Sequence, residues 1–136
     1  MATGLELFDL TGRTALITGS SQGIGLALAG GLAAAGASIV LNGRDPAKLT
    51  TTAEALRASG ATVHELPFDV TDHAGVREAV DGFETSHGPI DILVNNAGMQ
   101  HRGPLEEFEA EAFERLMHFV RWAAPDNWDA LHRGRG

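Results

Sequence analysis

The sequence predicts an α/β fold with a parallel sheet, because short apolar runs alternate along the chain with stretches of helical periodicity. Strands are expected at 14–18, 38–42, 62–66 and 90–94, with helical stretches between and after them. Successive strands joined by helical crossovers of this length run parallel and in a right-handed sense. The 136 residues are enough for one domain with a hydrophobic core of its own.

The first expected strand and helix flank a cluster of glycines. The apolar run at 14–18 ends in Gly19 and is typical of a buried strand. A helix rich in alanine and leucine is expected over 24–35. Gly36 follows it directly and suits the left-handed backbone that often ends a helix.

The second strand and helix have clear boundary signals. The run at 38–42, Ser-Ile-Val-Leu-Asn, predicts a strand. Asp45 followed by Pro46 is typical of a helix start, since aspartate caps the first amides and proline suits the first turn. Gly60 is expected to close this helix.

The remaining elements follow the same alternation. The run at 62–66 predicts a third, weaker strand, and 90–94 predicts a fourth. The helix between them carries an apolar stripe and is expected to end at Gly88. Apolar residues over 108–120 would form the stripe of a fourth helix, after which the alternation stops.

Composition excludes several classes of protein. The net charge of −8 argues against a nucleic acid or an anionic membrane as partner. The absence of cysteine excludes disulfides and thiolate metal sites, and the six histidines show no metal-binding spacing. The N-terminus has no signal-peptide pattern and no apolar run is long enough to span a membrane, so we expect a cytoplasmic protein.

Three glycines lie where the first strand passes into the first helix. Gly19, Gly23 and Gly25 allow a tight turn and let the backbone approach an anion closely. The first amides of the helix would then face that anion, which the helix dipole also favours. A plain strand–helix turn is the alternative, but the position at the start of a strand–helix–strand unit is the one a dinucleotide site requires.

Three motifs in this order resemble the short-chain dehydrogenase/reductase family. They are T-G-x-x-x-G-x-G at 18–25, Asp69 just after the third strand, and N-N-A-G at 95–98. The resemblance covers residues 11 to about 117. It implies a Rossmann-type, doubly wound parallel sheet, of which this chain would supply the strand order 3-2-1-4. It also implies homo-oligomeric assembly.

The resemblance implies cofactor-binding roles for three segments. The glycine turn would hold the pyrophosphate, with Gly19, Ser20, Ser21, Gln22, Gly23, Ile24 and Gly25. Asp69 would accept a hydrogen bond from the adenine amino group, beside the Val70 backbone; a simple turn or cap is the alternative. Asn96, Ala97 and Gly98 would bring backbone close to the ribose, although the asparagine pair could equally fix the fourth strand in the sheet.

The residues after the second strand bear on the choice of nicotinamide cofactor. An acidic residue there would bind the ribose 2′-hydroxyl of NAD and repel a 2′-phosphate. This chain has Asn42, Gly43 and Arg44 instead, and Asp45 is explained as a helix cap. The Arg44 guanidinium can bind a phosphate through two hydrogen bonds, so NADP is favoured over NAD. A solvated loop arginine is the alternative.

The stretch after Gly98 resembles the gluconate 5-dehydrogenase branch of the family. His101 and Arg102 would place positive charge where the carboxylate of a sugar acid could bind. A solvated loop pair is the alternative, and a fragment like a 3-oxoacyl reductase or a non-catalytic dinucleotide-binding module are alternative functions. The family's substrates are small polar alcohols and ketones.

The family's catalytic groups have no counterpart in the sequence. The family uses a serine, a tyrosine and a lysine four residues after the tyrosine, whereas this chain has no tyrosine and a single lysine, Lys48. We therefore assign no catalytic residue and expect no turnover from this chain alone. Resemblance fades near Met117, and both tryptophans lie beyond it. We predict a dinucleotide-binding domain at 1–117 and an aberrant tail at 118–136, as after a truncation or a reading-frame change.

Overall fold

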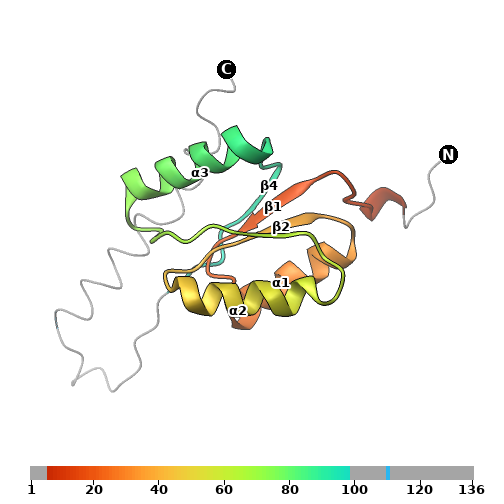
Figure 1. The fold of residues 1–136 in the computed structure, drawn as a ribbon, viewed down its shortest axis with the longest axis horizontal. Helices are drawn as coiled ribbons and strands as arrows, with labels where there is room; N and C mark the ends of the chain where they lie inside the picture. The colour runs from red at the N-terminus through yellow and green to blue at the C-terminus, as the bar shows by residue number, and fades with distance from the viewer. Residues whose placement is uncertain (1–5, 99–109, 111–136) are drawn as a thin grey trace.

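The computed structural model describes residues 6–98 and residue 110 (Figure 1). Four parallel strands form one sheet in the order β3-β2-β1-β4. The strands are β1 (Thr14–Ile17), β2 (Ser38–Leu41), β3 (Val63–Glu65) and β4 (Ile92–Val94). The helices are η1 (Glu6–Phe8), a single 3-10 turn, and α1 (Gly23–Ala34), α2 (Pro46–Arg57) and α3 (His73–His87). The predicted fold class and strand order are confirmed.

The strand register places β1 in the middle of the sheet. Thr14 of β1 pairs with Ser38 of β2, and Ile17 of β1 pairs with Val94 of β4. The chain therefore leaves β1 toward one side of the sheet, and β4 returns on the other side. Ligands of open α/β sheets bind at such a reversal, beyond the carboxyl ends of the strands.

Helices cover both faces of the sheet. Figure 1 shows α1 and α2 on one face and α3 on the other. Side chains alternate along β1, since Ala15 and Ile17 pack in the cluster with α1 and α2, whereas Leu16 packs in the cluster with α3. Because both faces are covered, the inner strands β1 and β2 are mostly buried apolar runs, whereas the edge strand β3 carries the partly exposed His64 and Glu65.

The helix boundaries follow the local signals closely. Asp45 Oδ1 accepts a hydrogen bond from the amide of Ala47 at 3.0 Å, as predicted for the cap of α2. Gly36 has a φ of +104° just beyond α1. The predicted end of α2 at Gly60 lies slightly too far along the chain, because α2 ends at Arg57 and a short turn leads to Gly60.

Several sequence predictions lie outside the described residues. These are the fourth helix at 108–120 apart from residue 110, the pair His101 and Arg102, and the tail at 118–136. Within the part of the chain that the structure describes, no helix has the length and apolar character needed to cross a membrane.

Candidate functional site

The loops that follow the four strands enclose a cavity of about 800 Å³ at the carboxyl edge of the sheet. It lies at the reversal between β1 and β4, where the fold predicts a ligand site. The described residues that line it are Gly19, Ser21, Gln22, Gly23, Ile24, Asn42, Gly43, Arg44, Phe68, Asp69, Val70, Asn96, Ala97 and Gly98. The structure thus brings together the three segments that the sequence motifs singled out.

The glycine turn is shaped by close backbone contacts. Gly19 and Gly23 both have φ of +61°, a left-handed conformation that favours glycine. A Cβ atom on Gly19 would lie 2.8 Å from the Cα of Ala97, so the turn meets the end of the β4 loop directly. A Cβ atom on Gly25 would lie 2.5 Å from Asn96 Nδ2. Only glycine therefore allows this approach of α1 to the sheet.

The N-terminus of α1 opens into the cavity. Gln22 is the N-cap residue and, among the described residues, gives no side-chain hydrogen bond to the helix amides. The first amides of a helix need a partner, and an anion at this end can supply it. Ile24 lines the cavity next to these amides and is 74% exposed. The turn thus fits the pyrophosphate of a dinucleotide.

Asn42 connects three of the loops and was missed as a site residue by the sequence analysis. Its Oδ1 accepts a hydrogen bond from the Gly19 amide at 3.0 Å, and its Nδ2 donates to the carbonyls of Leu66 and Phe68 at 3.1 and 3.2 Å. The side chain is 2% exposed. Only its polarity at the end of an otherwise apolar strand could have marked it.

Ser20 has a different role from the predicted one. Its Oγ donates to the Ile17 carbonyl at 2.7 Å and accepts from the Asn42 amide at 3.0 Å. Its own amide donates to the Asn42 carbonyl at 2.9 Å. The residue is fully buried, so its groups join the β1 and β2 ends rather than lining the cavity. Gly25 is likewise buried behind the turn.

Thr18 and Asn96 fasten the end of β4 to the glycine turn. Thr18 Oγ1 accepts hydrogen bonds from the amides of Asn96 and Ala97, both at 3.0 Å. Asn96 Nδ2 donates to the carbonyls of Thr18 and Gly19, both at 3.2 Å. The structural role that the sequence left open for the asparagine pair is therefore present in Asn96. Asn96, Ala97 and Gly98 still border the cavity.

Asp69 combines a turn with a position in the cavity wall. Its Oδ1 accepts hydrogen bonds from the Thr71 amide at 2.9 Å and from Thr71 Oγ1 at 2.7 Å. This is the turn role weighed as the alternative. Asp69 and Val70 nevertheless both line the cavity, and Val70 also packs in the core beneath α3. The position suits one end of an elongated ligand.

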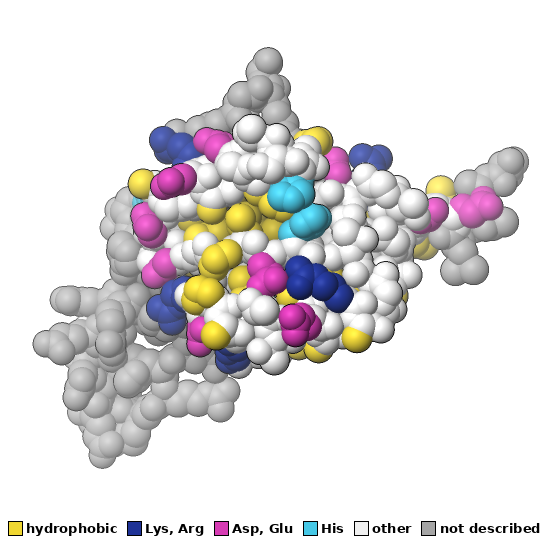
Figure 2. Space-filling view, viewed as in Figure 1, with side chains coloured by type: hydrophobic (Ala, Val, Ile, Leu, Met, Phe, Trp, Pro, Cys, Tyr) yellow, Lys and Arg dark blue, Asp and Glu magenta, His cyan; other side chains and the backbone are white. Residues whose placement is uncertain are grey.

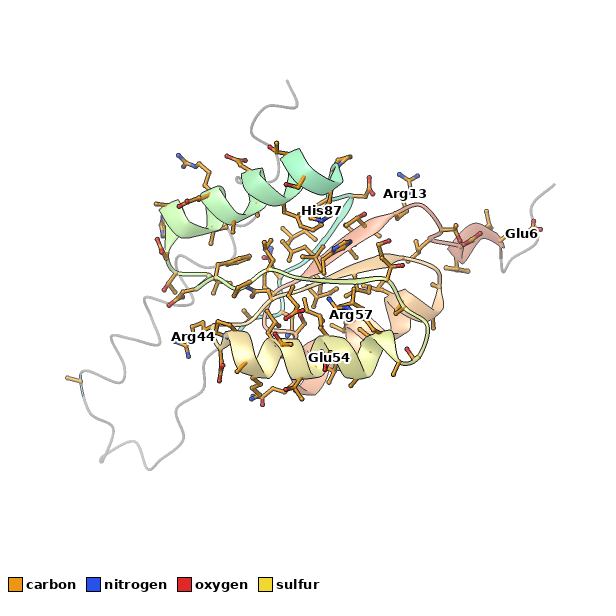
Figure 3. The ribbon with its side chains drawn as sticks, viewed as in Figure 1. Glu6, Arg13, Arg44, Glu54, Arg57 and His87 are labelled. Carbon is orange, nitrogen blue, oxygen red and sulfur yellow. The ribbon has the colours of Figure 1, made fainter. Side chains whose placement is uncertain are left out.

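Basic side chains lie on the rim next to the turn. Arg44 is exposed and lines the cavity, and Figure 3 shows it at the end of the molecule where α2 begins. Among residues 6–98 and 110, it has no hydrogen bond or ion pair. The Lys48 ammonium donates a hydrogen bond to Gln22 Oε1. Within the same residues, no group of three or more potential ligands could hold a metal ion.

Sequence comparisons identify close relatives. A family described as short chain dehydrogenase matches residues 13–121. The chain is 49% identical over 112 residues to gluconate 5-dehydrogenase of Gluconobacter oxydans strain 621H, which is 82% of this chain and 44% of that protein. It is 45% identical over 112 residues to 5-keto-D-gluconate 5-reductase of Escherichia coli K12, with the same two coverages.

A solved structure agrees with these matches. It is a gluconate 5-dehydrogenase from Burkholderia cenocepacia J2315 in complex with NADP and tartrate, with a TM-score of 0.89 and 48% identity. The match covers 96% of this chain and 51% of that chain. The chain thus spans about half the length of the relatives it matches. With the family match extending over most of its residues, this chain belongs to the short-chain dehydrogenase family.

Proposed function

We propose that the chain binds an adenine dinucleotide across the ends of β1 and β4. The observation that carries this proposal is the glycine turn, whose left-handed Gly19 and uncapped α1 amides open into the cavity. The turn at Gly19 and Ser21 to Ile24 would hold the pyrophosphate. Asp69 and Val70 would border the adenine, and Asn96 to Gly98 would border the ribose next to the nicotinamide.

NADP is the form that the site supports over NAD. A 2′-phosphate needs a cation, whereas a 2′-hydroxyl is bound by a carboxylate at the end of the second strand. The chain has Arg44 at that place, exposed and without a partner among the described residues. The next residue in sequence, Asp45, already caps α2. The relative from Burkholderia cenocepacia was solved with NADP, which supports the same choice.

The reaction class follows from the family and its relatives. When bound, the cofactor would supply or accept a hydride. Two relatives are named for gluconate and 5-ketogluconate, which favours a sugar acid as the substrate. His101 and Arg102, predicted near the substrate carboxylate, lie outside the described residues. We infer the cytoplasm as the location, and homo-oligomeric assembly, from the sequence and the family alone.

The chain by itself is proposed to bind cofactor without turnover. Its 136 residues contain no tyrosine, and its single lysine lies in the first turn of α2. A general acid of the family's type is therefore missing from this chain, which favours a binding module over an enzyme when the chain acts alone. The division into a binding domain at 1–117 and a tail at 118–136 belongs to the same proposal.

The test is isothermal titration calorimetry, in which the purified chain is titrated with NADPH and, separately, with NADH to measure the affinity for each. We expect saturable binding that is tighter for NADPH, and an Arg44→Ala variant that has lost this preference. Arg77→Ala, which removes an exposed cation of α3, is the matched control and should retain it.

Three results would contradict the proposal. The first is the absence of saturable binding by a chain that is folded by circular dichroism. The second is equal affinity of Arg44→Ala and the parent chain for each cofactor, which would remove the NADP assignment. The third is gluconate-dependent reduction of NADP by the purified chain, which would overturn the expectation of no turnover.

A further inference from the structure

The ammonium of Lys48 is held at the cavity by a neutral partner. Lys48 is in the first turn of α2, and its Nζ donates a hydrogen bond to Gln22 Oε1. Gln22 belongs to the glycine turn and lines the cavity. Among residues 6–98 and 110, no carboxylate forms an ion pair with Lys48. A full positive charge at this place is therefore bound only by an amide oxygen.

Two of the described cations that lack a carboxylate partner lie together at the site. Arg13 pairs with Asp91, and Arg57 pairs with Glu65. Arg44, Lys48 and Arg77 have no such partner among the described residues; Arg77 lies on α3, whereas Arg44 and Lys48 lie beside the glycine turn. The chain as a whole has 18 acidic and 10 basic residues, so two uncompensated cations on one rim favour an anionic ligand.

The backbone around Lys48 is fixed, while its side chain is exposed. One helical turn further along α2, Thr52 Oγ1 donates to the Ser21 carbonyl at 2.9 Å and so joins α2 to the glycine turn. The Lys48 amide donates to Asp45 Oδ1 at 3.3 Å. Asp45 Oδ1 is engaged with two helix amides. Glu65, which also contacts α2, accepts a hydrogen bond from Thr50 Oγ1 and pairs with Arg57. The ammonium can thus change partner without moving the turn.

A phosphate would be a stronger partner than the Gln22 amide. A hydrogen bond between two charged groups is stronger than one from a charged group to a neutral amide. We propose that Lys48 is a second binding group for the 2′-phosphate of NADP(H), which it reaches from Gln22 and shares with Arg44. This inference deepens the proposed function and depends on it.

The experiment compares two ligands that differ only in the 2′-phosphate, 2′,5′-ADP and 5′-AMP, by calorimetry on the full chain. We expect Lys48→Met to weaken 2′,5′-ADP binding roughly tenfold, the scale of one charge-assisted contact on a solvated rim. Binding of 5′-AMP should change less than about twofold, and Lys48→Arg should retain the affinity for 2′,5′-ADP. Arg77→Met, a change of equal charge on α3, should affect neither ligand.

Each alternative outcome has a defined meaning. Equal weakening of both ligands by Lys48→Met would show a purely structural role through Gln22 and would overturn the inference. Unchanged 2′,5′-ADP binding in Lys48→Met, with a loss in Arg44→Ala, would overturn it while leaving the proposed function intact. Absence of binding of both ligands by the parent chain would overturn both. If Lys48→Met does not fold, Lys48→Gln, which keeps a donor for Gln22, is subject to the same criteria.

Discussion

Asn42 Oδ1 accepts a hydrogen bond from the Gly19 amide across 3.0 Å, and so the end of β2 sets the position of the glycine turn after β1. The same side chain donates from Nδ2 to two carbonyls of the loop after β3, at Leu66 and Phe68. One amide group therefore holds three loops of the cavity wall. The side-chain amide of Asn42 is buried, and so is its bond to the Phe68 carbonyl, whereas its bonds to the Gly19 amide and the Leu66 carbonyl are partly buried. Removal of the group would leave all three partners without this hydrogen bond.

Replacement of Asn42 by leucine is predicted to destabilise the fold strongly. The Gly19 amide and two carbonyls would be left unsatisfied, at a cost of about 3 kcal/mol in the free energy of unfolding. Urea unfolding followed by circular dichroism measures this loss. Thr51→Ala removes an exposed hydroxyl that bonds only within α2, and as a control it should change stability by less than about 0.5 kcal/mol. A similar loss in both variants would show that Asn42 does not hold the loops.

A second prediction concerns the hydroxyl of Thr18. Thr18→Val keeps the shape of the side chain but removes the acceptor for the amides of Asn96 and Ala97. We expect a loss of about 2 kcal/mol and faster hydrogen exchange at these two amides. Thr18→Ser retains the hydroxyl and should preserve their protection. Unchanged exchange in Thr18→Val would mean that the β4 loop is held in place by other contacts.

Two glycines of α1 are predicted to respond in opposite directions to alanine. In Gly25→Ala, the new Cβ would meet Asn96 Nδ2 and the Gly19 carbonyl, so we expect a loss of about 2–3 kcal/mol. In Gly30→Ala, no atom lies within 4 Å of the new Cβ, and the helix should gain about 0.5–1 kcal/mol. Thermal unfolding of both variants provides the comparison, and equal shifts of the same sign would contradict it.

The strands and the three segments that line the cavity could be predicted because their signals are local. Apolar runs and the glycine spacing at 18–25 can be interpreted from residues that are neighbours in sequence. The hydrogen bonds of Asn42 and Ser20 could not be predicted, because they depend on which loops meet at the edge of the sheet. Asn42 is 23 residues from Gly19 and 26 from Phe68 in sequence. A polar residue beside a motif can thus either line the cavity or bond to other loops of the protein. Which of the two it does depends on tertiary contacts that the sequence does not reveal.

The pH dependence of stability is predicted to come partly from His64 of β3. Burial lowers the pKa of His64 below 6.5, and the nearby positive charges of His87 and Arg57 lower it further. Its ring contacts Phe83 and His87 at centroid distances of 5.3 and 4.5 Å. Figure 2 shows histidine side chains beside a hydrophobic patch on this face, next to basic and acidic groups.

The sign of the effect follows from proton binding. Between the folded-state pKa and 6.5, the unfolded chain binds more protons at His64 than the folded chain does, so stability increases with pH across this interval. The contribution of His64 is complete above about pH 6.5 and is lost as the pH falls toward the folded value. His64→Phe keeps an aromatic ring against Phe83 and removes the titration. Urea unfolding at several pH values between 5 and 7.5 should therefore give a shallower pH dependence for His64→Phe than for the parent chain, and identical slopes would exclude His64 as a source of the acid sensitivity.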